Sequence, residues 1–280
     1  MAVKYPVFLM AGSDVKRRKI MEVLDPEEKY KSKILLPMLG KPIIQWVLDE
    51  LLKSQFVEKI YVVGLKEEDV ELNGDVEFIP VETASDFIDK AKEGLEYLKN
   101  KGENPENIVF VNADVPGIDV KSIDSFYSQL QKYEKYDVLL GVVEQEIVEL
   151  AFPDSKRAPA KFRDYNLIQG EMLAMSPKII EEKGEIIQQF SNRRKQRSFN
   201  VMVKFVARAP RSWYRILKVL LKVAKVRDAI IGIERAFKCK ADIILVEDPG
   251  FAMDMDLPED YEILKKYVEE TKISSKIIAK

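Results

Sequence analysis

Short apolar runs alternate with amphipathic stretches through the first part of the chain. The runs at Tyr5–Met10, Lys59–Gly64 and Val76–Pro80 have the length and composition of buried strands. After Pro42, a residue that the first turn of a helix tolerates, apolar residues repeat with helical period. Strands that alternate with helices in this way predict parallel pairing, with helices on the faces of the sheet.

The same alternation continues to the end of the chain. Asn107–Asn112 is the clearest central strand, and it is followed by apolar runs at Tyr136–Val143 and Asp242–Val246. Helices are expected over Val120–Lys132 and Ala229–Lys238. The pattern therefore predicts a three-layer α/β fold around a mostly parallel sheet.

Composition restricts the class of protein. The chain has 280 residues, 46% of them hydrophobic and 33% charged, which is typical of a globular protein with an ample core. No apolar run approaches the roughly 18 to 20 residues of a membrane span, and no signal-peptide segment is visible, so a cytoplasmic location is expected. A single cysteine, Cys239, excludes an internal disulfide and a multi-cysteine zinc site.

The chain contains no histidine. This excludes Ser-His-Asp triads, Cys-His pairs and histidine zinc sites, and it leaves carboxylates, lysine, arginine, tyrosine and bound metal ions for chemistry. Phosphoryl-group transfer fits this inventory, because it depends on positioning and on charge neutralisation by Mg²⁺ and cations. Abundant lysine and glutamate with few glycines also suggest a heat-adapted source.

Charge is unevenly distributed, although the net charge is only -2. Residues Ile186–Arg227 hold 12 lysines and arginines and no acidic residue, which leaves 33 basic and 47 acidic residues elsewhere. Within this segment, basic residues at Arg211–Arg227 fall on one face of a helix. Such a helix is either a solvated surface element or a binding surface for an anion, a phosphorylated substrate or an anionic membrane.

The first strand leads into a loop with the features of a phosphate site. Its apolar run breaks at Gly12, and a lysine and arginine cluster follows at Lys16–Lys19. Glycine lets backbone N–H groups approach an anion, and the cations supply charge. The alternative is an ordinary turn between a strand and the next element.

The residues downstream of this loop carry a resemblance to a known family. The pair LMAG...KR and SKILLPMLGKP resembles the N-terminal signature of the nucleotidyltransferase superfamily with a GT-A-like Rossmann core, which includes sugar-phosphate and molybdenum-cofactor (MobA-like) nucleotidyltransferases. The resemblance implies that a nucleoside triphosphate is the substrate. The second half of the signature contains Lys33, Pro37, Gly40, Lys41 and Pro42.

Carried onto this sequence, the family signature assigns roles in phosphate binding. Ala11, Gly12 and Ser13 would line the triphosphate, Arg17 or Arg18 would hold the leaving pyrophosphate, and Lys33 would face the α-phosphate. The sequence departs from the family pattern in two ways. It has one glycine in the loop instead of several, and about a dozen extra residues precede Lys33.

A second loop is expected to contact the nucleotide base and ribose. The resemblance makes Thr83 and Ser85 candidates for this contact, at the start of a helix over Glu82–Lys99. Ser85 as a simple helix N-cap is the alternative.

Two acidic motifs are expected to bind the metal. Asn112 and Asp114 end the central strand in NADVPGI, at the carboxyl edge where open α/β sheets bind ligands. This motif resembles the family loop whose Asp binds Mg²⁺ and whose neighbours touch the nucleotide. Near the C-terminus, DMDLPEDY resembles a second family signature, which makes Asp256 the other metal ligand and Asp254 its substitute. The alternatives are a turn residue at Asp114 and helix capping at Asp256.

The remaining segments are expected to serve the acceptor. Phe152–Pro177 resembles the acceptor side of the family, with Gly170 near the acceptor. Lys161 and Arg163 are candidate phosphate contacts, or part of a solvated strand face. The expected organisation is a nucleotide-binding core at 1–176, a largely helical insertion at 177–237, and a return to the core at 238–280.

Together these features predict a Mg²⁺-dependent nucleotidyltransferase. It would transfer a nucleotidyl group from a nucleoside triphosphate to a phosphorylated or otherwise anionic acceptor, either a small molecule or a lipid phosphate, and release pyrophosphate. No nucleic acid partner is expected, and the basic helix allows peripheral contact with a membrane. The alternatives are a glycosyltransferase that uses a nucleotide sugar and a non-catalytic nucleotide sensor.

Overall fold

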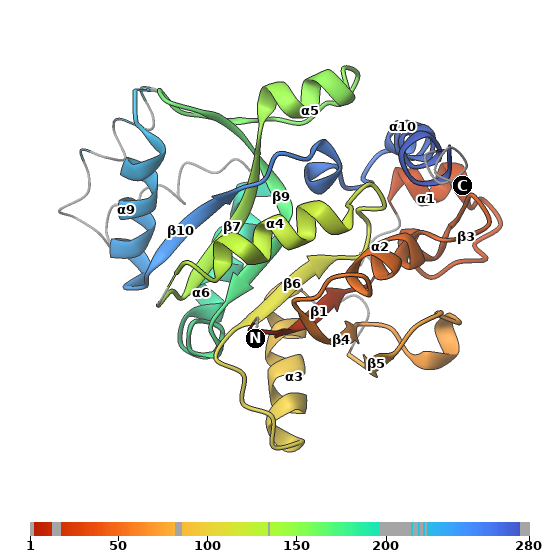
Figure 1. The fold of residues 1–280 in the computed structure, drawn as a ribbon, viewed down its shortest axis with the longest axis horizontal. Helices are drawn as coiled ribbons and strands as arrows, with labels where there is room; N and C mark the ends of the chain where they lie inside the picture. The colour runs from red at the N-terminus through yellow and green to blue at the C-terminus, as the bar shows by residue number, and fades with distance from the viewer. Residues whose placement is uncertain are drawn as a thin grey trace.

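A computed structural model shows an eight-stranded mixed sheet flanked by helices (Figure 1). It describes residues 3–12, 18–81, 86–133, 135–195, 214, 218, 221 and 223–274. The strand order is β5-β4-β1-β6-β9-β7-β10, with β8 paired to β9. The strands are β1 (Tyr5–Met10), β4 (Val57–Val63), β5 (Val76–Ile79), β6 (Ile108–Asn112), β7 (Val138–Glu144), β8 (Ala160–Lys161), β9 (Asn166–Met175) and β10 (Ala241–Leu245).

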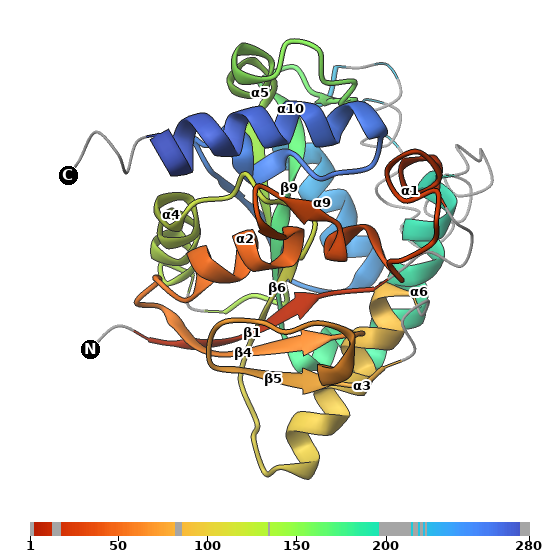
Figure 2. The same ribbon diagram turned by 90° about the vertical axis from the view of Figure 1, so that its right-hand side faces the viewer.

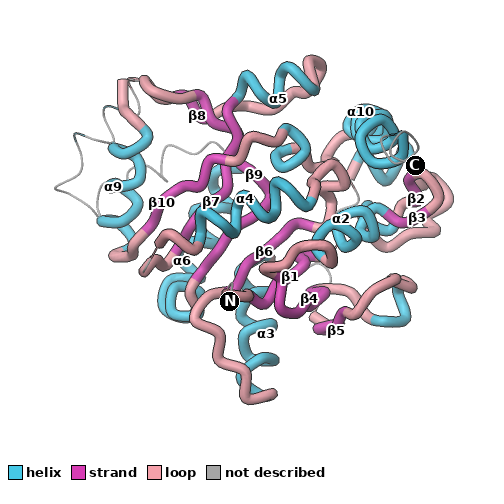
Figure 3. The backbone as a smooth tube through the Cα atoms, in the orientation of Figure 1, coloured by secondary structure: helices cyan, strands magenta, loops and turns pink. Residues whose placement is uncertain are grey.

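The sheet is parallel except at one central strand and its short partner. β9 runs antiparallel to both of its neighbours, β6 and β7, while the pairs β1–β4, β1–β6, β4–β5 and β7–β10 are parallel. Figure 3 colours the strands magenta and shows β5 and β10 at opposite edges. A separate two-stranded sheet joins β2 (Pro37–Met38) and β3 (Lys41–Pro42).

Alternate residues of the central strands build two cores, one on each face. Val7 and Leu9 of β1 enter the larger core, whereas Phe8 enters a second core on the opposite face. The larger core includes residues of α2, α4 and α10, and the second includes residues of α3 and α6. Figure 2 shows α2 and α10 on one side of β1 and β4, and α3 on the other. The predicted three-layer α/β fold is confirmed.

The helices follow from the periodic segments of the sequence. Pro42 stands immediately before α2, as expected, and Asp119 caps α4 by accepting a hydrogen bond from the backbone N–H of Ser122 at 2.8 Å. The helices are α1 (Lys19–Leu24), α2 (Ile43–Leu51), α3 (Phe87–Asn100), α4 (Val120–Leu130), α5 (Gln145–Ala151), α6 (Pro177–Lys195), α9 (Val226–Phe237) and α10 (Pro258–Val268).

Two local predictions are corrected. The N-cap of α3 is Asp86, not Ser85, because the helix begins at Phe87. The basic stretch Arg211–Arg227 is not one continuous helix: Tyr214 and Lys218 are helical, but Lys225 is the N-cap of the next helix. The backbone N–H groups of Val223 and Ala224 donate to the carbonyl of Lys218, and neither Val223 nor Ala224 is helical. The other basic residues of this stretch, apart from Arg227, lie outside the described residues.

The order of the strands places a ligand crevice beside β1. From β1 the chain moves outward through β4 to β5, and then returns to the other side of β1 as β6. Open α/β sheets bind ligands where the strand order reverses in this way, at the carboxyl ends of the strands. This crevice therefore lies between the residues that follow β1 and those that follow β6. The expected boundaries at 176 and 237 stay a prediction, while α6 packs against α3 of the core.

Gly64 fixes the start of the loop after β1. It has φ +103°, and a Cβ atom there would overlap the carbonyl oxygen of Ala11. We expect Gly64→Ala to lower the free energy of unfolding by about 3 kcal/mol or more, since both the backbone and the contact are unfavourable.

Gly102 is the matched control, because it also has a positive φ (+79°) but a Cβ atom added there would have no heavy atom within 4 Å. Gly102→Ala should cost only about 1 to 2 kcal/mol. Urea denaturation of both variants measures the difference. Equal losses would show that the contact with Ala11 does not constrain the loop.

Candidate functional site

A cavity of about 670 Å³ opens at the carboxyl ends of β1 and β6, beside residues 168–173 of the antiparallel strand β9. One part of it is lined by the residues after β1 and by the start of α3, and the other part by β9 and the loop before β8. Polar and charged residues converge between these two parts. They are Arg18, Lys33, Asn112, Asp114, Arg157, Glu171, Asp254 and Asp256.

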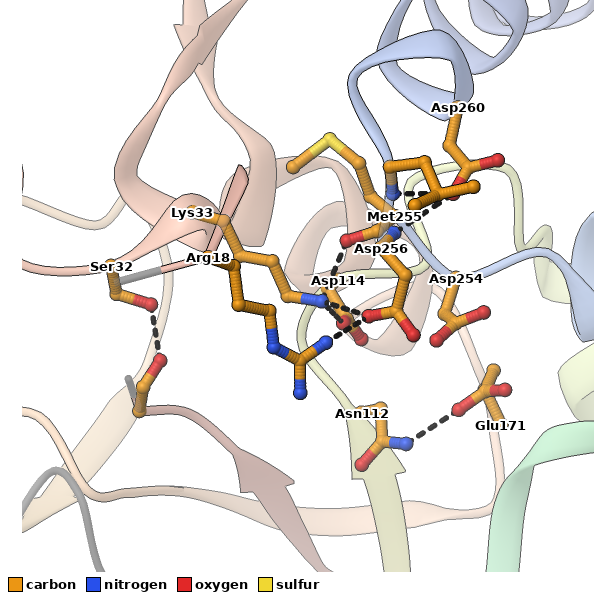
Figure 4. Close-up of polar contacts among 12 residues, drawn as sticks. Arg18, Ser32, Lys33, Asn112, Asp114, Glu171, Asp254, Met255, Asp256 and Asp260 are labelled. Carbon is orange, nitrogen blue, oxygen red and sulfur yellow. Dashed lines mark hydrogen bonds and ion pairs between the residues drawn. The ribbon is translucent and has the colours of Figure 1, made fainter. Parts of the chain in front are cut away.

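Three carboxylates from two distant parts of the chain meet in this cavity. Asp114 follows β6, and Asp254 and Asp256 lie in the segment before α10 (Figure 4). The two segments are joined directly, since the backbone N–H of Met255 donates to the carbonyl of Asp114 at 3.0 Å. One carboxylate oxygen from each aspartate lies within 4.8 Å of the others. Clustered carboxylate oxygens are the ligands that Mg²⁺ prefers, so these residues fit such an ion.

Lys33 bridges two of these carboxylates. Its Nζ lies 2.6 Å from Asp114 Oδ2 and 2.7 Å from Asp256 Oδ1. It also donates to the carbonyl of Met255 at 2.6 Å. Burial opposes the positive charge, but the attraction of the two carboxylates is stronger and raises the pKa of the Lys33 ammonium. Lys33 is therefore charged and lies at the centre of the site.

Asp256 is held by a second cation and by a helix terminus. Arg18 Nη1 donates to Asp256 Oδ1 at 2.5 Å. Burial disfavours ionisation of Asp256, but Lys33 and Arg18 outweigh it and lower its pKa to about 2. The carboxylate of Asp260, in the first turn of α10, accepts from the backbone N–H groups of Asp256 and Leu257 at 3.0 and 2.7 Å. The capping interpretation of this motif thus applies to Asp260, while the Asp256 side chain points into the cavity.

Asp254 contributes a carboxylate oxygen to the cluster, as Asp114 and Asp256 do. The sequence analysis had assigned it only as a substitute for Asp256. It pairs with Arg157, whose Nη2 also lies 3.3 Å from Asp260 Oδ2. Burial, followed by the negative charges of Asp114 and Asp256, raises the pKa of Asp254 to about 7. Arg157 was missed by the sequence analysis, because it lies in an irregular segment with no motif around it.

Glu171 on β9 is another residue that the sequence analysis missed. It accepts a hydrogen bond from Asn112 Nδ2 at 2.5 Å, so the Asn112 amide is engaged with Glu171. Burial, with the negative charges of Asp254 and Asp114, raises the pKa of Glu171 well above its usual range. Its only sequence signal was its place beside Gly170, which lines the same cavity. Neither Lys161 nor Arg163 is among the lining residues.

The opposite wall is formed by the loop after β1. Ala11 donates its backbone N–H to the carbonyl of Val63 at 2.9 Å, and its own carbonyl accepts from the buried Lys90 Nζ at 3.0 Å. The hydroxyl of Ser32 donates to the carbonyl of Gly12. The structure therefore brings Ala11, Gly12 and Lys33 to one side of the cavity.

Four of the predicted site residues cannot be placed. Ser13, Arg17, Thr83 and Ser85 lie outside the described residues. Among the described candidates, Ala11, Gly12, Arg18, Lys33, Asn112, Asp114 and Asp256 all line the cavity. Their proposed roles in nucleotide and metal binding stay predictions.

Comparison with known proteins finds a match to one family model. The family model described as "MobA-like NTP transferase domain" matches residues 28–198, which is more than half of the chain. This stretch includes Lys33, Asn112 and Asp114, whereas Arg18 and Asp256 lie outside it. The sequence matches none of the curated proteins at a significant level.

Several solved structures share the fold. A hypothetical transferase from Thermus thermophilus superposes with a TM-score of 0.72 at 18% identity, over 92% of this chain and 99% of that one. A CMP:2-keto-3-deoxy-manno-octonic acid synthetase complexed with CTP gives a TM-score of 0.57 at 12% identity, over 96% and 99%. A nucleotidyl transferase from Methanothermobacter thermautotrophicus gives 0.54 at 11%, over 96% and 99%.

The raised pKa of Asp254 predicts a pH dependence of stability. The folded protein keeps this proton up to about pH 7, whereas an aspartate with the usual pKa of 3.8 loses it earlier. The folded state therefore binds more protons in this window, and the contribution of Asp254 to stability falls as pH rises through it. Asp254→Asn should remove this loss.

Thermal unfolding without divalent cations measures the effect. The melting temperature of Asp254→Asn relative to the wild type should rise from pH 4 to pH 8. Asp154→Asn, at an exposed position, is the control and should show no such trend. A constant difference between Asp254→Asn and the wild type would contradict the prediction.

Proposed function

The chain belongs to the MobA-like NTP transferase domain family, and we propose that it is a Mg²⁺-dependent nucleotidyltransferase with an anionic acceptor. The reaction would transfer a nucleotidyl group from a nucleoside triphosphate to an oxygen of the acceptor. The bond from the acceptor oxygen to the α-phosphorus forms as the bond from that phosphorus to the pyrophosphate oxygen breaks. The products are the nucleotidylated acceptor and pyrophosphate.

One observation carries this proposal. The carboxylates of Asp114, Asp254 and Asp256 meet the cations Lys33 and Arg18 in a cavity at the carboxyl edge of the sheet. Phosphoryl-group transfer requires positioning and neutralisation of phosphate charge, and this arrangement provides groups for both. In the described part of the chain, the same cavity contains no Ser or Cys nucleophile.

The proposed roles follow from where each residue lies. Ala11 and Gly12 offer backbone at the end of β1 for the triphosphate, and Arg18 lies on the same side to hold the leaving pyrophosphate. Asp114 and Asp256, with Asp254, would hold Mg²⁺, which would neutralise and orient the α-phosphate when bound. Lys33 adds a positive charge beside the same position.

The acceptor would enter from the side of β9. Glu171 and Arg157 line that part of the cavity, opposite the loop after β1. An acceptor phosphate that is already ionised at neutral pH needs no general base. An acceptor hydroxyl would need a proton acceptor, and the carboxylates beside the site are the groups available for that role.

The basic segment is proposed to select an anionic acceptor. It begins within α6, and Gln188 of this helix lines the cavity and accepts a hydrogen bond from the backbone N–H of Ile88 at 3.1 Å. Beyond it, the described residues Tyr214, Leu221 and Val223 are exposed apolar side chains close in sequence to the basic positions. Basic and apolar groups together favour binding to an anionic surface or a phosphorylated substrate. No described helix has the length and apolar character needed to cross a bilayer.

The reaction itself can be tested with each of the four nucleoside triphosphates. The protein would be incubated with Mg²⁺ and fractions of a cell extract as the acceptor pool, and pyrophosphate release would be measured. Release that requires both an extract fraction and one nucleotide supports the proposal. A nucleotide-sugar glycosyltransferase would release no pyrophosphate from the triphosphates.

Asp114 and Asp256 are expected to act as one unit. Asp114→Asn and Asp256→Asn should each reduce Mg²⁺-dependent pyrophosphate release by about 10³ or more, and the double variant should lose scarcely more than either single one. Circular dichroism would verify that each variant is folded. Activity of Asp256→Asn within a few-fold of the wild type would remove Asp256 from the metal site.

The basic segment is tested by charge reversal. Changing Arg215, Lys218 and Lys222 together to glutamate should raise the acceptor KM about 10-fold or abolish binding to anionic vesicles, and leave affinity for the nucleotide unchanged. The control reverses three exposed lysines elsewhere, Lys121, Lys132 and Lys135, and changes the net charge equally. Equal effects in both triple variants would show that only net charge matters.

A further inference from the structure

Lys33 occupies the position between the two carboxylates that are proposed to hold the metal. Its ammonium group has three N–H donors. All three have a partner within hydrogen-bond distance: Asp114 Oδ2 at 2.6 Å, Asp256 Oδ1 at 2.7 Å and the carbonyl of Met255 at 2.6 Å (Figure 4). The side chain is only 13% exposed. Lys33 is thus enclosed by oxygen atoms in the way that a bound cation would be.

We propose that Lys33 is the resident counter-ion of this site and that a divalent cation must displace it. The displaced ammonium is then available to the α-phosphate of the nucleotide. The inference rests on the proposed function and adds to it a competition between one side chain and the metal. Lys33 would neutralise the carboxylates when no metal is present and the phosphate when the metal is present.

The geometry makes the two cations competitors. Mg²⁺ binds carboxylate oxygens at about 2.0 to 2.1 Å. An ion bound to Asp114 Oδ2 and Asp256 Oδ1 would share both oxygens with the Lys33 ammonium, which already lies 2.6 and 2.7 Å from them. Two positive charges within about 5 Å of each other in a partly buried site repel strongly. The ammonium and the ion therefore compete for these oxygens.

The charges around the aspartate cluster also favour a competition between Lys33 and the metal. The cluster holds three carboxylates, and in the described part of the chain three cations contact them: Lys33, Arg18 and Arg157. Arg157 contacts Asp254 and Asp260, and Arg18 contacts Asp256. Among the described residues, Lys33 is the one cation that contacts both Asp114 and Asp256. It is the group whose departure frees two ligands for the ion.

The Lys33 side chain can move while the backbone around it stays in place. Lys33 begins a single 3-10 turn, Lys33–Leu35, and the next two residues, Ile34 and Leu35, are buried in the larger core. The backbone is therefore anchored, while the four-carbon stem of lysine carries its charge on rotatable bonds. In the proposed displacement, a change of side-chain rotamer takes the ammonium from the carboxylates toward the cavity that Lys33 already lines.

Binding of Mn²⁺ without nucleotide or acceptor, measured by electron paramagnetic resonance, tests the competition. Lys33→Met should bind Mn²⁺ about 10-fold more tightly than the wild type, within the roughly 5- to 150-fold range of typical coupling between two ligands. Lys33→Arg keeps the charge and should stay within about 3-fold of the wild type. Lys41→Met is the matched control, because Lys41 pairs with Asp49 and stacks on Trp46, and it should change nothing.

Thermal unfolding provides the second readout. Without metal, Lys33→Met should melt below the wild type, because its carboxylates lose their counter-ion. Saturating Mn²⁺ should raise its melting temperature by more than that of the wild type, since tighter binding to the folded state stabilises it more. If Lys33→Met does not fold, Lys33→Gln replaces it in both measurements.

Equal or weaker Mn²⁺ binding by Lys33→Met would overturn the inference, as would the absence of Mn²⁺ binding in every variant. These measurements involve no turnover. A protein that releases no pyrophosphate can still show the predicted affinities, so failure of the proposed function is recognised separately. Conversely, pyrophosphate release with no effect of Lys33 on Mn²⁺ affinity would leave the proposed reaction in place and remove only the competition.

Discussion

The ion pairs of Lys33 with Asp114 and Asp256 are the interaction on which the site depends. Three carboxylates within 4.8 Å of one another repel, and partial burial strengthens that repulsion. The cluster persists because Lys33, Arg18 and Arg157 each bind part of it. The cations neutralise the three carboxylates unequally, and the pKa values differ accordingly. The pKa of Asp256, beside two cations, falls to about 2, whereas the pKa of Asp254 rises to about 7.

The fold supplies the close approach that these ion pairs need. Asp114 leaves the carboxyl end of β6, next to β1, and the segment before α10 is joined to it by the hydrogen bond from Met255. The segment of Lys33 is anchored from the other side by Ile34 and Leu35 in the larger core. Residues more than 200 positions apart in the sequence thus meet because a parallel sheet collects its carboxyl ends at one edge.

The antiparallel strand β9 gives the cavity its second half. It lies between β6 and β7 and brings Glu171 beside Asn112, in the cavity that the aspartate cluster also lines. Gly141 and Gly170 lie so close to the ring of Phe251 that a Cβ atom at either position would overlap it. This packing keeps β7 and β9 against the short 3-10 turn Pro249–Ala252, which precedes Asp254 and Asp256. The β9 wall of the cavity and the segment of Asp254 and Asp256 are therefore held by one set of contacts.

The sequence by itself determined the fold class, most of the parallel strands and most of the polar and charged residues that converge in the cavity. It could do so because these features are local. A strand or helix shows its period in the sequence, and motifs such as NADVP and DMDLPED contain the carboxylates of the site. It did not predict β9 as an antiparallel central strand, because an apolar run does not reveal the direction of its partners. The sequence also did not predict the ion pairs of Lys33 and Arg157 or the hydrogen bond of Glu171, since each joins segments far apart in the chain. Only the tertiary structure decided which carboxylates share a site and which cation each of them binds.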